Sequence, residues 1–388
     1  MNQSGLARSA VARIACAVVA AEVRHLRGTD LASATARAWP DALSIGDEGL
    51  GLDSIERLGA LGALAETFDL DDALLETGPP QRVGDWIDWI MRRHATTDGA
   101  ITVRTSGSTG APRECPHAVT DLVEEATWFA ARLANRKRVV ALVPGDHLYG
   151  IIWTALLPAS LDVPVVARTI GAPLDLMEGD LVVAVPEQWR ALSRMIRFQD
   201  DVVGVTSAGP FPDAIVGDVF DAGLARLIDI YGSSETGAIA WRDVPAACYE
   251  ILDRWELAPH VDDGWQLEDR NGRLAALPDH IDRVGHRSLR LAGRRDGAVQ
   301  IAGHNVWPER VAGILGGVDG VSDMAVRLHV NGGLKAFVVP RADVSPVTLQ
   351  ADLERMAVAR LREHERPRSF RFGDRLPRNA MGKLEDWS

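Results

Sequence analysis

The sequence predicts an α/β protein that begins with a small helical unit. Short apolar runs typical of buried strands alternate with helical patterns from about residue 98 to residue 230. Polar, glycine-rich turns follow several of these runs, where α/β folds bind their ligands. The first hundred residues instead show only helical periodicity.

Composition narrows the possible functions. The chain has 388 residues, of which 46% are hydrophobic and 25% charged, which is typical of a globular protein of two or three domains. A net charge of -12 argues against nucleic acid as the main partner. The 3 cysteines and 10 histidines show no metal-ligand spacing, which favours a cytoplasmic protein. The apolar run from Ile14 to Ala21 is too short to cross a membrane, so we expect no membrane partner.

Three helices are expected before residue 97: Ser9 to Arg27, Ser54 to Phe68 and Val83 to Arg93. The second should begin at a cap formed by Asp53 or Ser54 and keep Glu56 and Glu66 on its wet face. Its predicted apolar face consists of Ile55, Leu58, Leu61, Leu64 and Phe68. The third helix has an apolar side made by Trp86, Ile87, Trp89 and Ile90.

Strands are predicted at residues 100–104, 139–143, 163–167, 181–185, 202–206 and 227–230, with a helix over residues 121–136. Pro164 lacks a backbone donor, so its strand should begin at the proline or lie at a sheet edge. The run from Leu181 to Val185 is apolar throughout, as expected of a strand buried on both faces.

The stretch from Thr105 to Arg113 predicts a loop that holds an anion. Small residues leave backbone N–H groups free to converge on a phosphate, hydroxyls add donors, and Arg113 adds a positive charge. The pattern is not a Walker loop, and a flexible Gly/Ser linker is the alternative. The small residues are Thr105, Ser106, Gly107, Ser108, Thr109 and Gly110.

A second motif follows the last predicted strand and consists of Tyr231, Gly232, Ser233, Ser234, Glu235, Thr236 and Gly237. Together with the anion loop it resembles the adenylate-forming superfamily, which includes acyl- and aryl-CoA ligases, peptide-synthetase adenylation domains and luciferases. The resemblance runs from about residue 98 to the C-terminus. It implies that a carboxylic acid reacts with ATP to give acyl-AMP and pyrophosphate, and that the acyl group then passes to a thiol.

The resemblance also implies roles for individual residues. Thr105, Ser106, Ser108, Thr109 and Arg113 would hold the β,γ-phosphates, with Arg113 in the family's usual lysine position. Glu235 would bind Mg²⁺, and Thr236 would donate to the α-phosphate. Tyr231 would stack on adenine, with ordinary core packing as the alternative. Residues Ser207, Ala208 and Gly209 would pass by adenine and the acid, and His147, in a P-x-x-H-x-Y-G motif, would orient the acid.

Further matches imply a mobile α+β domain at residues 295–388, behind an ATP- and acid-binding domain at residues 98–294. Gly293-Arg294-Arg295-Asp296 resembles the hinge between the two, and Arg294 would touch the ribose or a phosphate. Asp279, with Asp282 as a substitute, matches the ribose-binding aspartate. Lys383 matches the catalytic lysine that bridges acid and phosphate during adenylation.

Two further departures from the family accompany Arg113 at the lysine position. The α/β region that usually precedes the phosphate loop is missing, and Gln300 replaces a common lysine. This compact architecture resembles the hydroxybenzoate ligases of aryl-polyene and xanthomonadin-type pigment pathways. A small aromatic acid is therefore the expected substrate, with His147, Tyr149 and Trp153 surrounding its ring.

The helical unit itself, over roughly residues 10–95, resembles an acyl carrier protein through Gly51–Glu56 and Arg82–Ile87. The resemblance implies that Ser54 carries phosphopantetheine, whereas an ordinary helix N-cap is the alternative. Three functions remain open: a ligase that loads CoA or a carrier protein, a ligase that loads its own Ser54, and a non-catalytic carrier-binding scaffold.

Overall fold

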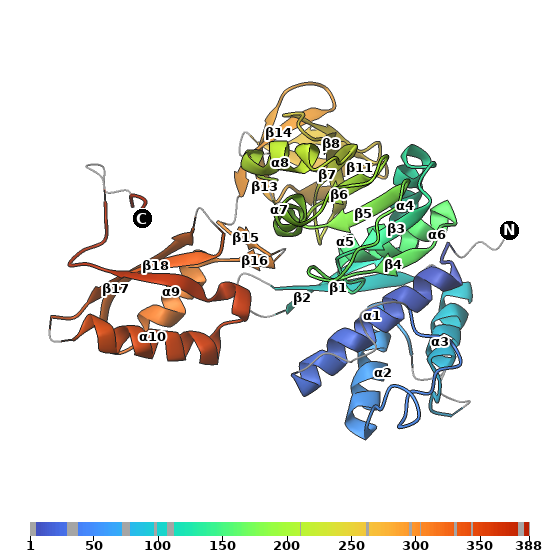
Figure 1. Ribbon diagram of the computed structural model, residues 1–388, viewed down its shortest axis with the longest axis horizontal. Coiled ribbons are helices and arrows are strands. Elements are labelled where there is room, and N and C mark those ends of the chain that lie inside the picture. Colours follow the sequence, from blue (N-terminus) through green and yellow to red (C-terminus); the bar gives the residue numbers. More distant parts are fainter. Residues whose placement is uncertain are drawn as a thin grey trace. The chain divides into compact units, whose positions relative to one another are not determined.

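The computed structural model divides the chain into two compact units (Figure 1). Unit 1 comprises Met1–Thr105, Arg113–Ala275 and Arg283–Arg290, and unit 2 comprises Ser106–Pro112, Ala276–Asp282 and Leu291–Ser388. The boundaries predicted after residues 97 and 294 stay predictions. The structure describes residues 5–28, 38–71, 78–96, 99–106, 112–209, 211–260, 264–294, 297–302, 304–329, 332–342, 344–378 and 384–387.

The expected helical segment is present and belongs to unit 1. It contains α1 (Arg8–Arg27), α2 (Ser54–Phe68) and α3 (Val83–Thr96), with α1 packed against both of the others. The third helix continues three residues beyond the predicted end at Arg93. Its predicted apolar residues are all buried, at 0–2% exposure: Trp86, Ile87, Trp89 and Ile90.

The predicted buried face of α2 is wrong in part. Its buried residues are Glu56, Ala60, Leu64 and Phe68, spaced four apart, whereas Ile55 and Leu58 are 69% and 72% exposed. Glu56 was expected in water but is buried, because its carboxylate pairs with Arg27 and accepts the Asp53 N–H. Neutralisation and capping together make a buried carboxylate tolerable at this position.

A nine-stranded sheet in the order β13-β14-β9-β8-β7-β6-β5-β3-β4 confirms the α/β class. Strands β3 to β7 are parallel, and β7, β8, β9 and β14 are joined by antiparallel pairing. The strands are β3 (Arg138–Ala141), β4 (Val165–Ala167), β5 (Asp180–Ala184), β6 (Val203–Thr206), β7 (Arg226–Ser233), β8 (Gly237–Asp243), β9 (Tyr249–Ile251), β13 (Asp279–Arg283) and β14 (Ser288–Arg294).

The parallel half of this sheet follows the sequence prediction closely. Strand β5 is buried at every position, and β4 begins immediately after Pro164 and lies last in the sheet order. Strand β7 continues past the predicted end at Ile230 to Ser233, because those last residues pair with β8 in a hairpin. The antiparallel half gave no comparable signal in the sequence.

The other elements between α3 and β13 form two smaller sheets and several helices. A two-stranded sheet is formed by β1 (Ala100–Ser106) and β2 (Pro112–Ala118), and a three-stranded sheet by β10 (Trp255–Pro259), β11 (Trp265–Asp269) and β12 (Leu274–Ala276). Helix α4 covers Val119–Arg132, starting and ending earlier than predicted. The others are α5 (Leu148–Ile151), the π-helix η2 (Ile152–Leu156), α6 (Leu157–Leu161), α7 (Pro186–Met195), η3 (Asp213–Ile215) and α8 (Val216–Asp221).

Unit 2 has the α+β composition expected of a small C-terminal domain. Its three-stranded sheet, ordered β17-β18-β19, has antiparallel and then parallel pairing. Helices α9 and α10 contribute Leu315 and Leu353 to a core that includes Val338. Its elements are β15 (Val299–Ile301), β16 (His304–Val306), α9 (Pro308–Gly316), β17 (Val321–Leu328), β18 (Leu334–Pro340), α10 (Pro346–Arg360), η4 (Glu363–Glu365) and β19 (Pro367–Phe372).

Candidate active site

The second sequence motif forms the hairpin between β7 and β8. Ser233 pairs with Gly237, so Ser234, Glu235 and Thr236 make the turn. A Cβ atom at Gly232 would lie 2.3 Å from the Gly237 carbonyl oxygen, so only glycine fits there. The Glu235 side chain is exposed at the tip of the turn, where it is available to a ligand.

The hydroxyl groups of this turn bond within it. Ser233 Oγ accepts the Glu235 N–H at 3.2 Å and lies 3.1 Å from Thr236 Oγ1. Thr236 is buried, and its hydroxyl donates to the Gly237 carbonyl oxygen at 3.0 Å. These bonds stiffen the turn beneath Glu235. The predicted bond from Thr236 to an α-phosphate would require that hydroxyl to change partner.

Three side chains hold the turn from outside the motif: Glu125 and His117 are buried, and Arg254 is half-buried. Glu125 Oε2, on α4, accepts the Ala238 N–H at 3.0 Å, and Arg254 donates to the Thr236 carbonyl oxygen at 2.6 Å. His117, on β2, lies 2.7 Å from the Ser234 carbonyl oxygen through Nε2. Burial raises the pKa of Glu125 and lowers the pKa of His117.

The carboxyl ends of β6 and β7 bring two predicted segments together. Ser207 Oγ, just after β6, donates to the Ile230 carbonyl oxygen at 2.9 Å, directly before Tyr231. Ala208 has a φ of 63°, a backbone strain that is common at binding sites. Tyr231 is buried, with its ring edge-on to Tyr249 at 6.0 Å, so the adenine and core-packing roles both stay open.

The order in which the chain adds parallel strands to the sheet reverses at β3. The chain leaves β3 for β4 on one side and returns as β5 on the other, and α/β folds place ligands at such switch points. His147 follows β3 here, is exposed, and lies with Nδ1 3.2 Å from Asp146 Oδ1. The Tyr149 hydroxyl lies within 3.1 Å of the carbonyl oxygens of Ala184 and Val205, at the ends of β5 and β6.

Trp153 does not support the expected ring pocket. It is 1% exposed, as a core residue is, and its ring centroid lies 4.6 Å from that of Phe129 and 6.5 Å from that of Tyr149. The side chains of Trp153 and Tyr149 therefore both make their contacts with other groups of the protein. Among the three expected ring contacts, His147 alone presents an exposed side chain.

The other predicted site residues lie on several strands. Arg113 is exposed on β2, Thr105 and Ser106 end β1, Arg294 ends β14, and Asp279 and Asp282 lie on β13. Gln300, on β15, bonds through its side chain to Asn305 on β16. Four loop residues and the lysine lie outside the described residues: Gly107, Ser108, Thr109, Gly110 and Lys383.

Similarity to known proteins decides the family. A model of the AMP-binding enzyme C-terminal domain matches residues 311–383. A 4-coumarate–CoA ligase of Rhodobacter capsulatus is 36% identical, with 97% of this chain and 100% of the relative aligned. The chain belongs to the adenylate-forming superfamily. A second 4-coumarate–CoA ligase, from Halorhodospira halophila, is 35% identical over 87% of this chain and 88% of the relative.

These relatives make the chain an acid–thiol ligase, which sets aside the scaffold hypothesis. An o-succinylbenzoate CoA synthetase from Bacillus subtilis has the same fold, with a TM-score of 0.60 at 19% identity over 73% of this ligase and 67% of that chain. The predicted α/β fold with a small C-terminal domain is thus confirmed. The likenesses to pigment-pathway ligases and to carrier proteins stay predictions.

Adenylate-forming ligases use ATP and Mg²⁺, so we ask whether the turn at Glu235 suits a magnesium ion. The described part of the ligase contains no group of three or more His, Cys, Asp or Glu side chains placed to hold a metal ion. A single exposed carboxylate suits a magnesium ion that takes most of its ligands from phosphate oxygens and water. Glu235 therefore fits a metal that arrives with the nucleotide.

Sequence reasoning missed the three residues that hold the turn. Glu125 follows another glutamate in a helical pattern, so it resembled a solvent-facing charge, and Arg254 lies in a turn without a motif. His117 had the clearest signal, since it lies on the strand that follows the phosphate loop. The described helices of the ligase also include none with the length and apolarity needed to cross a bilayer.

Proposed function

We propose that this ligase adenylates a small aromatic carboxylic acid with ATP and transfers the acyl group to the thiol of CoA. The observation that carries the proposal is the β7–β8 hairpin, which presents Glu235 beside the strand ends that carry Ser207 and Tyr231. The named activity of the relatives from Rhodobacter capsulatus and Halorhodospira halophila, 4-coumarate–CoA ligase, supports the aromatic substrate and the CoA acceptor.

The first step joins two anions, so the site must neutralise charge and align the reactants. A carboxylate oxygen attacks the α-phosphorus of ATP, the bond to the β-phosphate breaks, and pyrophosphate leaves with the bonding electrons. Arg113 and the small residues of its loop would stabilise the departing phosphates, and Lys383 would bridge the acid and the phosphate. Mg²⁺ bound at Glu235 would supply further neutralisation of phosphate oxygens.

The second step forms the thioester. The thiol sulfur attacks the acyl carbon of acyl-AMP, AMP leaves with the electron pair of the broken C–O bond, and the thiol proton passes to solvent. Rotation of the small domain between the two steps is a prediction from the match of Gly293–Asp296 to the family hinge, near Asp296. His147 would orient the acid from the turn after β3, where its side chain is exposed.

ATP–pyrophosphate exchange with a panel of acids tests this proposal. The panel contains 4-coumarate, 4-hydroxybenzoate, 2-succinylbenzoate and a long-chain fatty acid, each with and without Mg²⁺. Exchange should be largest with an aromatic acid, and thioester formation is then measured with CoA and, separately, with a holo carrier protein. Absence of exchange with every acid would reject the proposal, and exchange with the fatty acid alone would reject the aromatic class.

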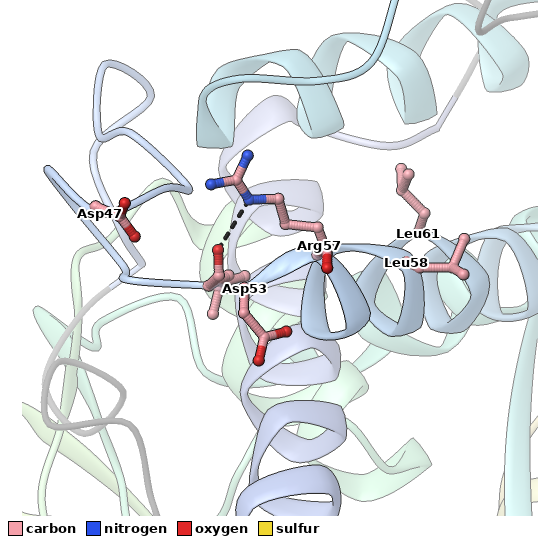
Figure 2. Close-up of a pocket in the computed structure, with 7 residues that line it drawn as sticks. Asp47, Asp53, Arg57, Leu58 and Leu61 are labelled. Atoms are coloured by element: carbon pink, nitrogen blue, oxygen red, sulfur yellow. Dashed lines mark hydrogen bonds between the residues drawn. The ribbon is translucent and has the colours of Figure 1, made fainter.

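A second candidate function is self-loading at Ser54. Asp53 forms the capping box at the start of α2 by accepting the Glu56 N–H at 2.9 Å, so the cap does not use the Ser54 hydroxyl. Ser54 is exposed and lines an open hollow of about 520 Å³ together with Leu58 and Leu61 of α2 (Figure 2). Arg57 borders the same hollow and donates to the Leu52 carbonyl oxygen at 2.9 Å.

Intact-mass measurement tests the self-loading hypothesis. The ligase is incubated with CoA and a phosphopantetheinyl transferase, which would join the phosphopantetheine phosphate to Ser54 Oγ and release adenosine 3′,5′-bisphosphate. The hypothesis predicts a mass increase of one phosphopantetheine group that is absent from Ser54→Ala. An unchanged mass in the wild-type chain, beside a carrier protein that is modified in the same tube, would reject it.

A further inference from the structure

We infer that Glu125, Arg254 and His117 are positioning residues that hold the Ser234–Glu235–Thr236 turn in the geometry needed for magnesium-dependent ATP binding. The inference rests on the proposed role of Glu235. None of the three residues belongs to a sequence motif of the site. Arg254 and His117 bond to backbone carbonyl oxygens of the turn, and Glu125 bonds to the backbone N–H of Ala238, two residues after the turn.

Glu125 and Arg254 enclose the second half of the turn. The Arg254 guanidinium donates to Glu125 Oε2 at 3.2 Å and to the Thr236 carbonyl oxygen at 2.6 Å. The same Glu125 oxygen accepts the Ala238 N–H at 3.0 Å. The ion pair thus holds backbone groups on both sides of Gly237, and any rotation of the turn would break at least one bond to a buried charge.

Gly237 is the residue that lets the carboxylate come so close. Its φ of 71° lies in the left-handed region, and a Cβ atom there would be 2.7 Å from Glu125 Oε2. The final glycine of the Y-G-S-S-E-T-G motif therefore has a physical reason in this chain. Gly237 leaves space for the buried Glu125 side chain, which bonds to the backbone next to the turn.

His117 holds the first half of the turn from β2, the strand that also carries Arg113. Its strand, β2, begins at Pro112, the residue before Arg113. Burial lowers the pKa of His117, so near neutral pH the imidazole is uncharged and carries its proton on Nε2, which donates to the Ser234 carbonyl oxygen. The turn is thereby hydrogen-bonded to the strand that carries Arg113.

The energetics favour a positional role over a stabilising one. The side chains of Glu125 and Arg254 are 3% and 17% exposed, and burying such a pair costs about as much desolvation energy as its attraction returns. Its remaining bonds nevertheless go to backbone groups around the turn. An ion pair with little net stability but several directed bonds is suited to fixing the Glu235 carboxylate.

The test measures magnesium dependence rather than activity alone. Glu125→Met removes both carboxylate oxygens, and Arg254→Lys is the second variant in case the first does not fold. Asp180→Asn is the matched control, since it disrupts another pair of a buried acid and an arginine, formed by Asp180 on β5 and Arg138 on β3. ATP binding is measured by calorimetry with and without Mg²⁺, together with exchange activity across a Mg²⁺ titration, the KM for the acid and the thermal midpoint.

We expect Glu125→Met or Arg254→Lys to raise both the Kd for MgATP and the Mg²⁺ concentration at half-maximal exchange about tenfold, because misplacement of a catalytic group is costly. The KM for the acid should not change. Asp180→Asn should lower the thermal midpoint without either effect. A folded Glu125 or Arg254 variant with wild-type MgATP binding would overturn the inference, whereas a wild-type chain without exchange would reject the proposed function instead.

Discussion

A buried acid pairs with a half-buried arginine at each end of the parallel strands, and the two pairs have different roles. At the amino ends of β3 and β5, Arg138 donates to Asp180 at 2.6 and 2.9 Å, and Asp180 also accepts the Met177 N–H. At the carboxyl end of β7, Glu125 and Arg254 bond around the turn that presents Glu235. The same chemistry aligns two strands at one end and, in our proposal, positions the turn that binds MgATP at the other.

This contrast follows from the direction of the strands. Parallel strands present their following loops at one edge of the sheet, and ligands bind there, while the loops at the other edge close the fold. Loss of a buried charge near the amino ends should therefore affect stability alone, whereas loss of one near the carboxyl ends should also affect nucleotide use. Substitutions at each end can separate these two outcomes.

The largest effect is expected at the tip of the turn. Glu235→Gln removes the charge while keeping the side-chain size, and we expect exchange activity to fall about a hundredfold, or about 2.7 kcal/mol of transition-state stabilisation. Because Glu235 is exposed, its thermal midpoint should stay within a degree or so. Glu250→Gln, at an exposed position of β9 in the same sheet, is the control and should keep full activity. Equal activity in both variants would remove Glu235 from the site.

At the opposite end, Asp180→Asn should act on stability. Asp180 is fully buried and Arg138 is 13% exposed, so loss of the carboxylate leaves a buried guanidinium without its counter-charge. We expect the free energy of unfolding to fall by about 3 kcal/mol, measured by urea denaturation. Activity per folded molecule, at a temperature where the variant is fully native, should match wild type. Reduced activity with unchanged stability would contradict the contrast between the two ends.

The phosphate loop gives a smaller test at the functional end. Arg113 is exposed, so Arg113→Ala should leave the fold intact and raise the KM for ATP about tenfold, which corresponds to the loss of one charge-assisted hydrogen bond. Arg113→Lys should recover most of this loss if charge is what matters. An unchanged KM in the alanine variant would exclude Arg113 from ATP binding.

Features of this molecule that follow from backbone patterns were predictable from the sequence. Features that depend on specific side-chain contacts were not. The parallel strands were predictable because continuous apolar runs such as Leu181–Val185 have few alternative structures. The face of α2 was not, since its leucines satisfy one helical stripe while α1 buries another that begins at Glu56. The motif at Tyr231–Gly237 was visible, but its supports at Glu125 and Arg254 come from distant parts of the chain and have no local pattern.

The smallest effect on stability is expected at an exposed ion pair close to Arg138 and Asp180. Lys137 and Glu178 adjoin Arg138 and Asp180 at the amino end of the sheet, and their charged groups are 3.2 Å apart. Both side chains are about two-thirds exposed, at 65% and 67%, so water screens their attraction and the flexible chains lose entropy on pairing. Glu178→Gln should therefore change the free energy of unfolding by no more than about 0.5 kcal/mol in the same urea experiment. A loss as large as that of Asp180→Asn would mean that position at the strand start, rather than burial, determines what an ion pair contributes there.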